Sequence, residues 1–285
     1  MGEGIAESGM KGRVCVVTGA TSGGIGQATA AELVRRGATV VLVARSRERA
    51  ERTREAVMQA GGRDRVSVVL ADLSVQAQVR EAAAEILERW PAVHVLVNNA
   101  AVYTPRRQET PDGIELQLAV NHLAPFLLTN LLLDGLRAGA PARVVTVSSG
   151  AHRYARLRWD DLGMRGRYHG LLQYSNTKLC NVLFTRELAR RVPAAAVIAN
   201  TMHPGVVGTD LLFNGWAPLR LLKPFIRTPE QGARTAVHLA AAPEVAGVTG
   251  AYFHDERETR PSAAAMDDDA ARRLWEISGA LTRLA

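Results

Sequence analysis

Short runs of apolar and β-branched residues recur along this chain, and a longer helix-compatible stretch separates each run from the next. Such alternation is typical of βαβ units, in which helices join parallel strands and cover both faces of the sheet. Several runs are apolar at nearly every position, as strands buried on both faces should be. The expected strands lie near 13–17, 39–43, 66–70, 93–97, 143–147, 197–202 and 250–253.

The stretches between these runs predict the helices and the topology. Right-handed crossovers fold this order into an α/β, Rossmann-type doubly wound parallel sheet of about seven strands, with helices on both faces. We expect a single domain over 1–285, with 1–10 flexible and 211–229 inserted as a loop beside the substrate. The expected helices lie near 25–36, 48–60, 75–89, 112–137, 171–191, 230–241 and 267–281.

Composition narrows the class of protein. A chain of 285 residues with 47% hydrophobic residues can bury one sizeable core. Its N-terminus lacks the apolar run of a signal peptide, and no segment reaches the ~20 apolar residues that cross a bilayer. We therefore expect a cytoplasmic protein with no membrane span, in which Cys15 and Cys180 are buried free thiols.

The charge and the histidines raise two further classes of ligand. The net charge is +7, but the Lys and Arg residues are scattered and only 5% of residues are aromatic, so we expect no nucleic acid partner. The seven histidines show no ligand-like spacing with one another or with the cysteines, so no metal site is expected. Binding of an anionic cofactor and a solvated surface account for the net positive charge.

A glycine-rich loop follows the first expected strand and runs directly into a helix. Glycines let a backbone approach a pyrophosphate, and the amides at the helix start favour its negative charge. Glycine-rich turns also occur for purely steric reasons, but the position after the first strand favours a dinucleotide. The candidate phosphate-binding residues are Gly19, Thr21, Ser22, Gly24, Ile25 and Gly26.

The next strand ends carry further candidates for cofactor binding. Arg45 follows the second strand, where a guanidinium favours the extra phosphate of NADP, although a solvated arginine at a helix start is the plain alternative. Asp72 and Leu73 follow the third strand, where a carboxylate can accept from the adenine amino group or cap a helix. Asn99 follows the fourth strand, and we expect it mainly to tie strand ends together.

Tyr174 and Lys178 lie four residues apart in an expected helix and therefore share one face. A phenol with a pKa of ~10 is a poor acid-base catalyst at neutral pH, and a neighbouring ammonium is expected to lower that pKa. The pair alone occurs by chance in many helices. Three other signals accompany this pair. Asn121 lies inside an expected helix, although asparagine is a poor helix former. Ser148 and Ser149 end the fifth strand, and a turn follows the sixth strand. That turn contributes Pro204, Gly205, Val207 and Thr209.

Together these residues resemble the short-chain dehydrogenase/reductase family, and within it the retinol dehydrogenase-like branch, from about Lys11 to the last helix. The resemblance implies that Tyr174 is the general acid or base, and that Lys178 lowers its pKa and holds the nicotinamide ribose. It implies that Ser149 hydrogen-bonds the substrate oxygen and that Asn121 positions a water in a proton relay to Lys178. It also implies that Thr209 holds the carboxamide of the nicotinamide. The segments that carry the branch resemblance are 115–117, 127–132, 184–189, 228–233 and 271–275.

The spacing between serine and tyrosine supports this resemblance, and the sequence departs from the family pattern at two places. Ser149 is preferred over Ser148 because it stands 25 residues before Tyr174, as in that branch, and Ser148 is then expected to point into the fold. The glycine loop holds one residue more than the family's usual pattern, which puts the phosphate geometry in doubt. Ala101 stands where the family often has glycine, and we expect only a local shift there.

The expected function is NADP(H)-dependent interconversion of a carbonyl and an alcohol on a bulky, largely apolar substrate such as a retinoid, steroid or polyketide, with reduction favoured. A dehydratase or double-bond reductase on the same fold, or a non-catalytic NADP-binding regulatory protein, are the alternatives. A homodimer or homotetramer is the candidate assembly. The residues expected to shape the substrate pocket are Val102, Tyr103, His152, Leu171, Leu212, Phe213, Trp216 and Phe225.

Overall fold

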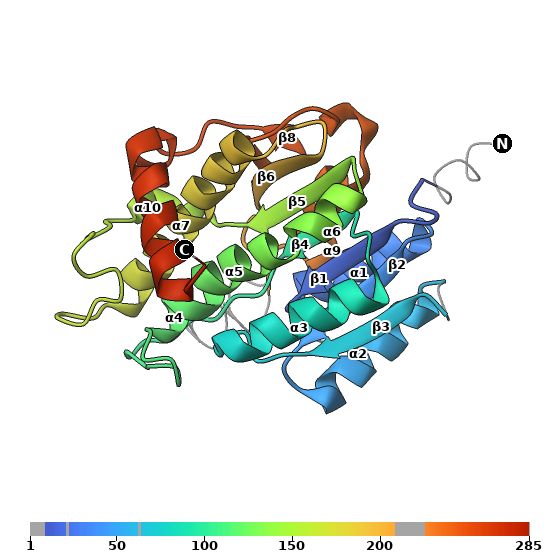
Figure 1. Ribbon diagram of the computed structural model, residues 1–285, viewed down its shortest axis with the longest axis horizontal. Coiled ribbons are helices and arrows are strands. Elements are labelled where there is room, and N and C mark those ends of the chain that lie inside the picture. The colour runs from blue at the N-terminus through green and yellow to red at the C-terminus, as the bar shows by residue number, and fades with distance from the viewer. Residues whose placement is uncertain (1–8, 21–22, 62–63, 209–225, 285) are drawn as a thin grey trace.

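Eight strands form one sheet in the order β3-β2-β1-β4-β5-β6-β7-β8, parallel except for the antiparallel pair β7 and β8 (Figure 1). The computed structural model describes residues 9–20, 23–61, 64–208 and 226–284. The strands are β1 (Val14–Thr18), β2 (Thr39–Ala44), β3 (Val66–Leu70), β4 (Val95–Asn98), β5 (Ala142–Val147), β6 (Val197–His203), β7 (Tyr252–His254) and β8 (Arg257–Glu258). The doubly wound α/β fold is confirmed, and the seven predicted strands end within two residues of their expected bounds.

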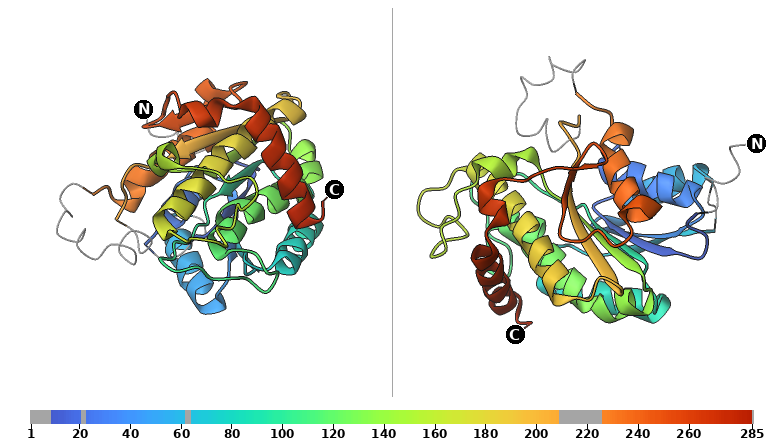
Figure 2. Two further views of the ribbon diagram at one scale, coloured as in Figure 1. Left: turned by 90° about the vertical axis from the view of Figure 1, so that its left-hand side faces the viewer. Right: turned by 90° about the horizontal axis from the view of Figure 1, so that it is seen from above.

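Helices cover both faces of the sheet (Figures 1 and 2). On one face lie α1 (Ile25–Arg35), α2 (Arg47–Gln59) and α9 (Pro229–Ala241), and on the other α3 (Gln76–Arg89), α5 (Ala124–Leu131) and α7 (Gly170–Arg191). A further helix, α10 (Asp268–Thr282), packs outside α7. Side chains of β1 alternate between the two cores, because Cys15 and Val17 face α1 and α9 while Val16 faces α3 and α5.

Local sequence signals explain where several helices begin. The hydroxyl of Ser46 caps α2 by accepting from the backbone N–H of Arg49. Thr228 and Gln231 form a reciprocal capping box at the start of α9, with Pro229 at its first position. Asp267 caps α10, whose first turn is acidic as the helix dipole favours. Because these motifs are local, the starts of these three helices can be located from the sequence alone.

The predicted continuous helix over 112–137 is wrong. Residues 110–113 form a turn in which Gly113 adopts a φ of 73°, and helical structure begins only at Leu116. It continues as α4 (Leu116–Leu118), a π-helical turn η1 (Ala119–Leu123), α5 and then α6 (Leu133–Ala138). Asp112 and Gly113, at which the predicted helix began, are exposed in this turn.

Other differences are smaller. The two-residue strand β8 was not predicted, because both of its residues are exposed and carry no apolar pattern. Met10 is buried and its N–H donates to the carbonyl of Arg36, and the flexibility of 1–10 stays a prediction. Of the predicted insertion 211–229, residues 211–225 lie outside the described part, Arg227 bridges Val207, and Pro229 already belongs to α9.

Two sequence expectations concern redox state and membranes. Cys15 and Cys180 are free and buried as predicted, and burial raises the pKa of each thiol to about 12. A thiol that stays protonated is a poor nucleophile. Among the described residues, no helix has both the length and the apolar character that a bilayer crossing requires.

Candidate active site

The candidate catalytic residues meet where β4, β5 and β6 end. Ser149 follows β5, Tyr174 and Lys178 lie in α7, and Asn121 lies in η1, which packs against α7. The carboxyl ends of parallel strands meet at one edge of a sheet, so groups far apart in sequence become neighbours there. The structure thus brings all four predicted catalytic residues into one region.

Lys178 is almost completely buried beneath Tyr174. Its side chain is 1% exposed, its Nζ lies 5.5 Å from the centroid of the Tyr174 ring, and it donates to the carbonyl of Val147 at 3.0 Å. Burial lowers the pKa of Lys178 to about 7. An ammonium has three N–H donors, and Val147 takes only one of them among the described residues. The remaining donors can serve a hydroxyl-rich ligand.

Burial raises the pKa of Tyr174 to about 12, and a hydrogen bond with Ser149 opposes this rise. The predicted lowering of this pKa by Lys178 is therefore wrong for this arrangement. The physical reason is that Nζ faces the ring and bonds Val147, while the half-buried phenol has lost part of its hydration. Tyr103 packs edge-on against the same ring, with the centroids 6.3 Å apart.

The adjacent serines point in different directions. Ser148 is buried, and its hydroxyl donates to the carbonyl of Lys178 at 2.7 Å, in line with its predicted inward orientation. Ser149 accepts at Oγ from the N–H of Ala151 at 3.2 Å, and its hydroxyl lies close enough to the Tyr174 phenol to oppose the rise in the pKa of that phenol. In a strand, successive side chains face opposite sides. Only Ser149 therefore shares the crevice with Tyr174.

The side chain of Asn121 is fully buried and fully engaged. Its Oδ1 accepts from the N–H of Val102 at 2.7 Å, while its Nδ2 donates to the carbonyl of Val102 at 2.9 Å and to Thr177 Oγ1 at 3.1 Å. Asn121 thereby ties the loop after β4 to α7. Asn121 lies within the π-helical turn η1, and such turns occur frequently at functional sites.

In the glycine loop, some glycines allow close backbone packing, and the start of α1 leaves its amides open to a ligand. A Cβ on Gly19 would lie 2.5 Å from Ala100 Cα, and one on Gly26 would lie 2.5 Å from Asn99 Nδ2, so these glycines allow close approach of backbone segments. Gly24 caps α1 and Ile25 is its first residue, so the helix amides there are available to an anion. Thr21 and Ser22, beside the extra loop residue, lie outside the described part.

Arg45 and Asp72 end neighbouring strands and approach to 3.8 Å. The Arg45 side chain is 74% exposed, so its guanidinium can turn to an incoming phosphate. Asp72 also accepts from the backbone and hydroxyl of Ser74, so it caps the turn before α3, and Leu73 packs against the core. Asn99 donates to the carbonyls of Thr18 and Gly19, which is the structural tie expected of it.

The turn after β6 is held by residues that sequence reasoning missed. Pro204 follows this strand, and at Gly205, which adopts a φ of 80°, a Cβ would lie 2.7 Å from Arg227 Nε. Arg227 makes a bidentate ion pair with Asp255, and its backbone bonds both Val206 and Gly208. No local motif indicates this contact between distant segments. Thr209, predicted to hold the carboxamide, lies outside the described part.

The predicted pocket residues divide into three groups. Val102, Tyr103 and Leu171 are partly exposed, and Leu171 is 41% exposed at the start of α7. His152 is buried, and its ring nitrogens engage the carbonyl of Ser149 at 2.7 Å and the N–H of Ser262 at 3.1 Å, so it serves structure. The predicted pocket residues outside the described part are Leu212, Phe213, Trp216 and Phe225.

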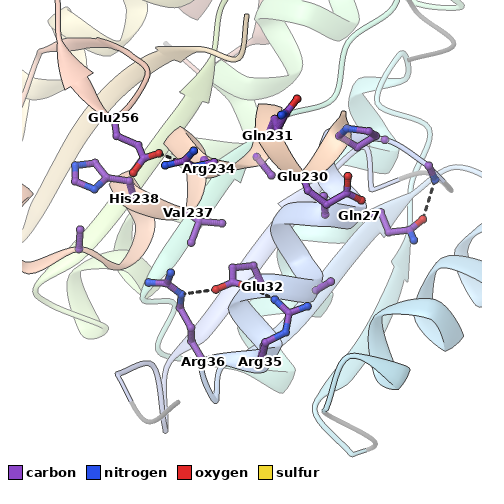
Figure 3. A pocket seen from close by; sticks show the side chains of 17 residues that line it. Gln27, Glu32, Arg35, Arg36, Glu230, Gln231, Arg234, Val237, His238 and Glu256 are labelled. Carbon is purple, nitrogen blue, oxygen red and sulfur yellow. Dashed lines mark hydrogen bonds and ion pairs between the residues drawn. The ribbon is translucent and has the colours of Figure 1, made fainter. Parts of the chain in front are cut away.

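A separate groove of about 600 Å³ runs between α1 and α9 (Figure 3). Most of its charged residues pair locally: Glu32 bonds both Arg35 and Arg36, and Arg234 bonds Glu256. None of the four catalytic candidates lines it. The groove is therefore not the catalytic crevice.

Comparison with known proteins agrees with this geometry. The family model described as short chain dehydrogenase matches residues 13–217. The chain belongs to the short-chain dehydrogenase family. Within the family it is similar to retinol dehydrogenase 14 of Mus musculus, at 43% identity over 94% of this chain and 85% of that protein. It is also similar to human retinol dehydrogenase 13, at 38% identity over 96% and 85% of the two chains. The predicted family and branch are thus confirmed.

Solved structures of other proteins share the fold. A crystal structure of a protein from Mycobacterium Paratuberculosis superposes with a TM-score of 0.78, at 34% identity over 96% of this chain and 94% of that chain. The RhlG/NADP active-site complex of Pseudomonas aeruginosa superposes with a TM-score of 0.71, at 26% identity over 87% and 96% of the two chains. The chain therefore shares its fold with both solved structures over most of its length.

Proposed function

We propose that this short-chain dehydrogenase is an NADP(H)-dependent carbonyl reductase acting on a bulky, largely apolar ketone or aldehyde. The observation that carries the proposal is the contact between the Tyr174 phenol and the Ser149 hydroxyl above the buried Lys178. Two hydroxyl donors that converge beside a cation suit a reaction in which charge develops on a carbonyl oxygen.

The residues present fit a nicotinamide dinucleotide. The open N-terminus of α1 at Gly24 suits a pyrophosphate, Lys178 keeps N–H donors for ribose hydroxyls, and Pro204, Gly205 and Val207 supply a surface for a flat ring. When bound, the cofactor supplies the hydride. The exposed Arg45 supports NADP over NAD, and the Pseudomonas aeruginosa RhlG structure is named as an NADP complex.

The proton chemistry follows from the site. The Tyr174 phenol is protonated at neutral pH, and it can donate its proton to the substrate oxygen as negative charge develops on that oxygen. Ser149 stabilises the same oxygen with a second hydrogen bond. Lys178 holds the phenol in place, and Asn121 positions the water of the proton relay. Asn121 is itself fixed by its bonds to Val102 and Thr177. The direction of the reaction depends on the cofactor ratios in the cell, and the proposed preference for NADP(H) favours reduction.

The substrate class is proposed from the crevice lining and the relatives. Val102, Tyr103 and Leu171 present apolar and aromatic surface near Tyr174, which suits a lipophilic carbonyl such as a retinoid, steroid or polyketide-like compound. The similar mouse and human proteins are named retinol dehydrogenases. The cytoplasmic location and the homodimer or homotetramer stay predictions.

A panel of retinoid, steroid and aromatic carbonyls tests the proposal. Purified protein is mixed with NADPH and each carbonyl, and consumption is followed by absorbance with the alcohol product identified by mass. We expect turnover with at least one bulky apolar carbonyl and its loss in Tyr174→Phe. Loss of water or reduction of a carbon–carbon double bond would favour the other enzymes on this fold. Binding of NADPH without turnover of any compound would favour a regulatory protein.

A further inference from the structure

Glu115 is a buried carboxylate that the proposed chemistry does not use. It is 1% exposed, and the described residues form no ion pair with it. A buried charge is costly unless hydrogen bonds compensate it. Its retention beside the catalytic helices therefore calls for a structural explanation.

Four donors satisfy the two oxygens of Glu115. Its Oε1 accepts from the N–H of Gln117 at 3.0 Å and from the Tyr168 hydroxyl at 3.0 Å. Its Oε2 accepts from the N–H of Leu118 at 2.7 Å and from Gln173 Nε2 at 2.8 Å. The carboxylate thus caps α4 and at the same time holds two residues that flank the start of α7.

The same donors extend the network to the loop after β4. Gln117 Nε2, which carries two N–H donors, lies 2.7 Å from the Tyr168 hydroxyl, 3.1 Å from the carbonyl oxygen of Gly170 and 3.2 Å from that of Thr104. Gly170 packs so closely that an added Cβ would lie 2.3 Å from the Thr104 carbonyl oxygen. The loop after β4, α4 and the start of α7 are therefore held together by hydrogen bonds and close packing.

Each of these segments carries a group of the proposed site. Gln173 directly precedes Tyr174, the loop after β4 contains Val102, to which Asn121 is bonded, and α4 leads without interruption into the turn that holds Asn121. A displacement of α7 relative to α4 would move the Tyr174 phenol away from Ser149. Misplacement of a reacting group by about 1 Å can cost roughly 100-fold in rate.

We infer that Glu115 is a positioning residue for the proposed reductase, setting the place of Tyr174 through Gln173 and Tyr168. The inference rests on the proposed function for its kinetic consequences. Glu115 acts through the start of α7 and touches neither substrate nor cofactor. Its effect should therefore fall on turnover and leave the dinucleotide site intact.

The first test compares Glu115→Gln with Glu109→Gln. The amide of the first variant would present N–H donors to a neighbour that is itself a donor, whereas Glu109 is an exposed carboxylate paired with Arg107 on the adjoining segment. We expect kcat of Glu115→Gln to fall by about 10- to 100-fold, with the Kd for NADPH within about threefold of the unmodified protein. We expect Glu109→Gln to retain kcat within about twofold.

A second variant keeps the test decisive if Glu115→Gln fails to fold. Tyr168→Phe removes one hydroxyl and keeps the ring, and we expect kcat to fall by about three- to tenfold. In the double variant, the two losses should be less than multiplicative, because both remove the same contact. Values of kcat within twofold of the unmodified protein in Tyr168→Phe, or fully multiplicative losses, would overturn the inference.

Hydrogen exchange separates this inference from the proposed function. We expect amides of residues 170–177 to exchange at least tenfold faster in Glu115→Gln or Tyr168→Phe, with α9 unchanged. Unchanged exchange at 170–177, or faster exchange throughout the protein, would overturn a positioning role even if no carbonyl is reduced. An unmodified protein that reduces no carbonyl but shows the local change would refute only the proposed function.

Discussion

The two halves of the sheet place their functional groups differently. In the half formed by β1 to β4, Arg45 is 74% exposed and Gly24 lies at an open helix start. In the half that holds the catalytic residues, Lys178 and Asn121 are almost fully buried and bonded to distant segments. A cofactor site can be assembled from strand ends alone, whereas proton chemistry needs groups withdrawn from water and held by tertiary contacts.

The contrast also appears in the titrating groups. Burial shifts the pKa of Tyr174 up and that of Lys178 down, whereas the described groups at the ends of β2 and β3 are solvated or capped. Substitutions in the cofactor half should therefore change binding, and substitutions in the catalytic half should change turnover or stability. The predictions below probe that division.

The largest effect is expected at Tyr174. Tyr174→Phe removes the proton donor and keeps the ring, so kcat should fall by roughly 1000-fold while NADPH affinity stays within about threefold. Stopped-flow turnover and fluorescence titration with NADPH measure the two quantities. Tyr154→Phe, at a side chain that is 76% exposed, is the matched control and should retain normal kcat. Near-normal turnover in Tyr174→Phe would remove the proposed mechanism.

His122 should make the catalytic half sensitive to acid. Burial lowers the pKa of His122 to about 4, below its unfolded value of 6.5, so the folded state binds fewer protons. Stability should therefore fall as the pH drops from about 6.5 through about 4, by about 3 kcal/mol from this residue.

Urea unfolding at several pH values measures this loss. His122→Asn should be less stable at pH 7, because it loses the bond to Ser278, but should show a flatter dependence below pH 6.5. His169→Asn, at an exposed histidine, should keep the slope of the unmodified protein. Equal slopes in all three proteins would contradict the assignment to His122.

Arg45 tests the cofactor half. Arg45→Asp should reduce the preference for NADPH over NADH by roughly 10- to 100-fold, because charge-assisted hydrogen bonds contribute about 1.5–3 kcal/mol. The ratio of kcat/KM for the two cofactors measures the change. Arg52→Asp, on the exposed part of α2, should leave the ratio unchanged. A protein that uses both cofactors equally before mutation would refute the NADP assignment.

The smallest effect is expected from Ser148→Ala. It removes one buried hydrogen bond to the carbonyl of Lys178 and should lower the free energy of unfolding by about 1 kcal/mol, with kcat within about threefold. Ser149→Ala should instead lower kcat by at least tenfold at nearly unchanged stability. Thermal unfolding and turnover of both variants decide between them. A larger loss of kcat in Ser148→Ala would reverse the assignment of the two serines.

Short-range patterns predicted much of the fold and the approximate site. Seven apolar runs gave the expected strands, and four-residue spacing placed Tyr174 and Lys178 on one helical face, which the position of Nζ over the ring agrees with. The π turn at Asn121 was not predictable in this way, because its cause is a pair of bonds to Val102 in another segment. Arg227 and its contact with Gly205 escaped prediction for the same reason.

The sequence by itself determined the order of the strands and helices, the family, and which residue types stand at the strand ends. Periodicity, capping residues and glycines act over a few neighbours, so they can be recognised along the chain. Only the tertiary structure decided the protonation of Tyr174 and Lys178 and the bonding of Glu115. These properties depend on which distant groups exclude water from a side chain or replace it, and that arises only when the layers pack.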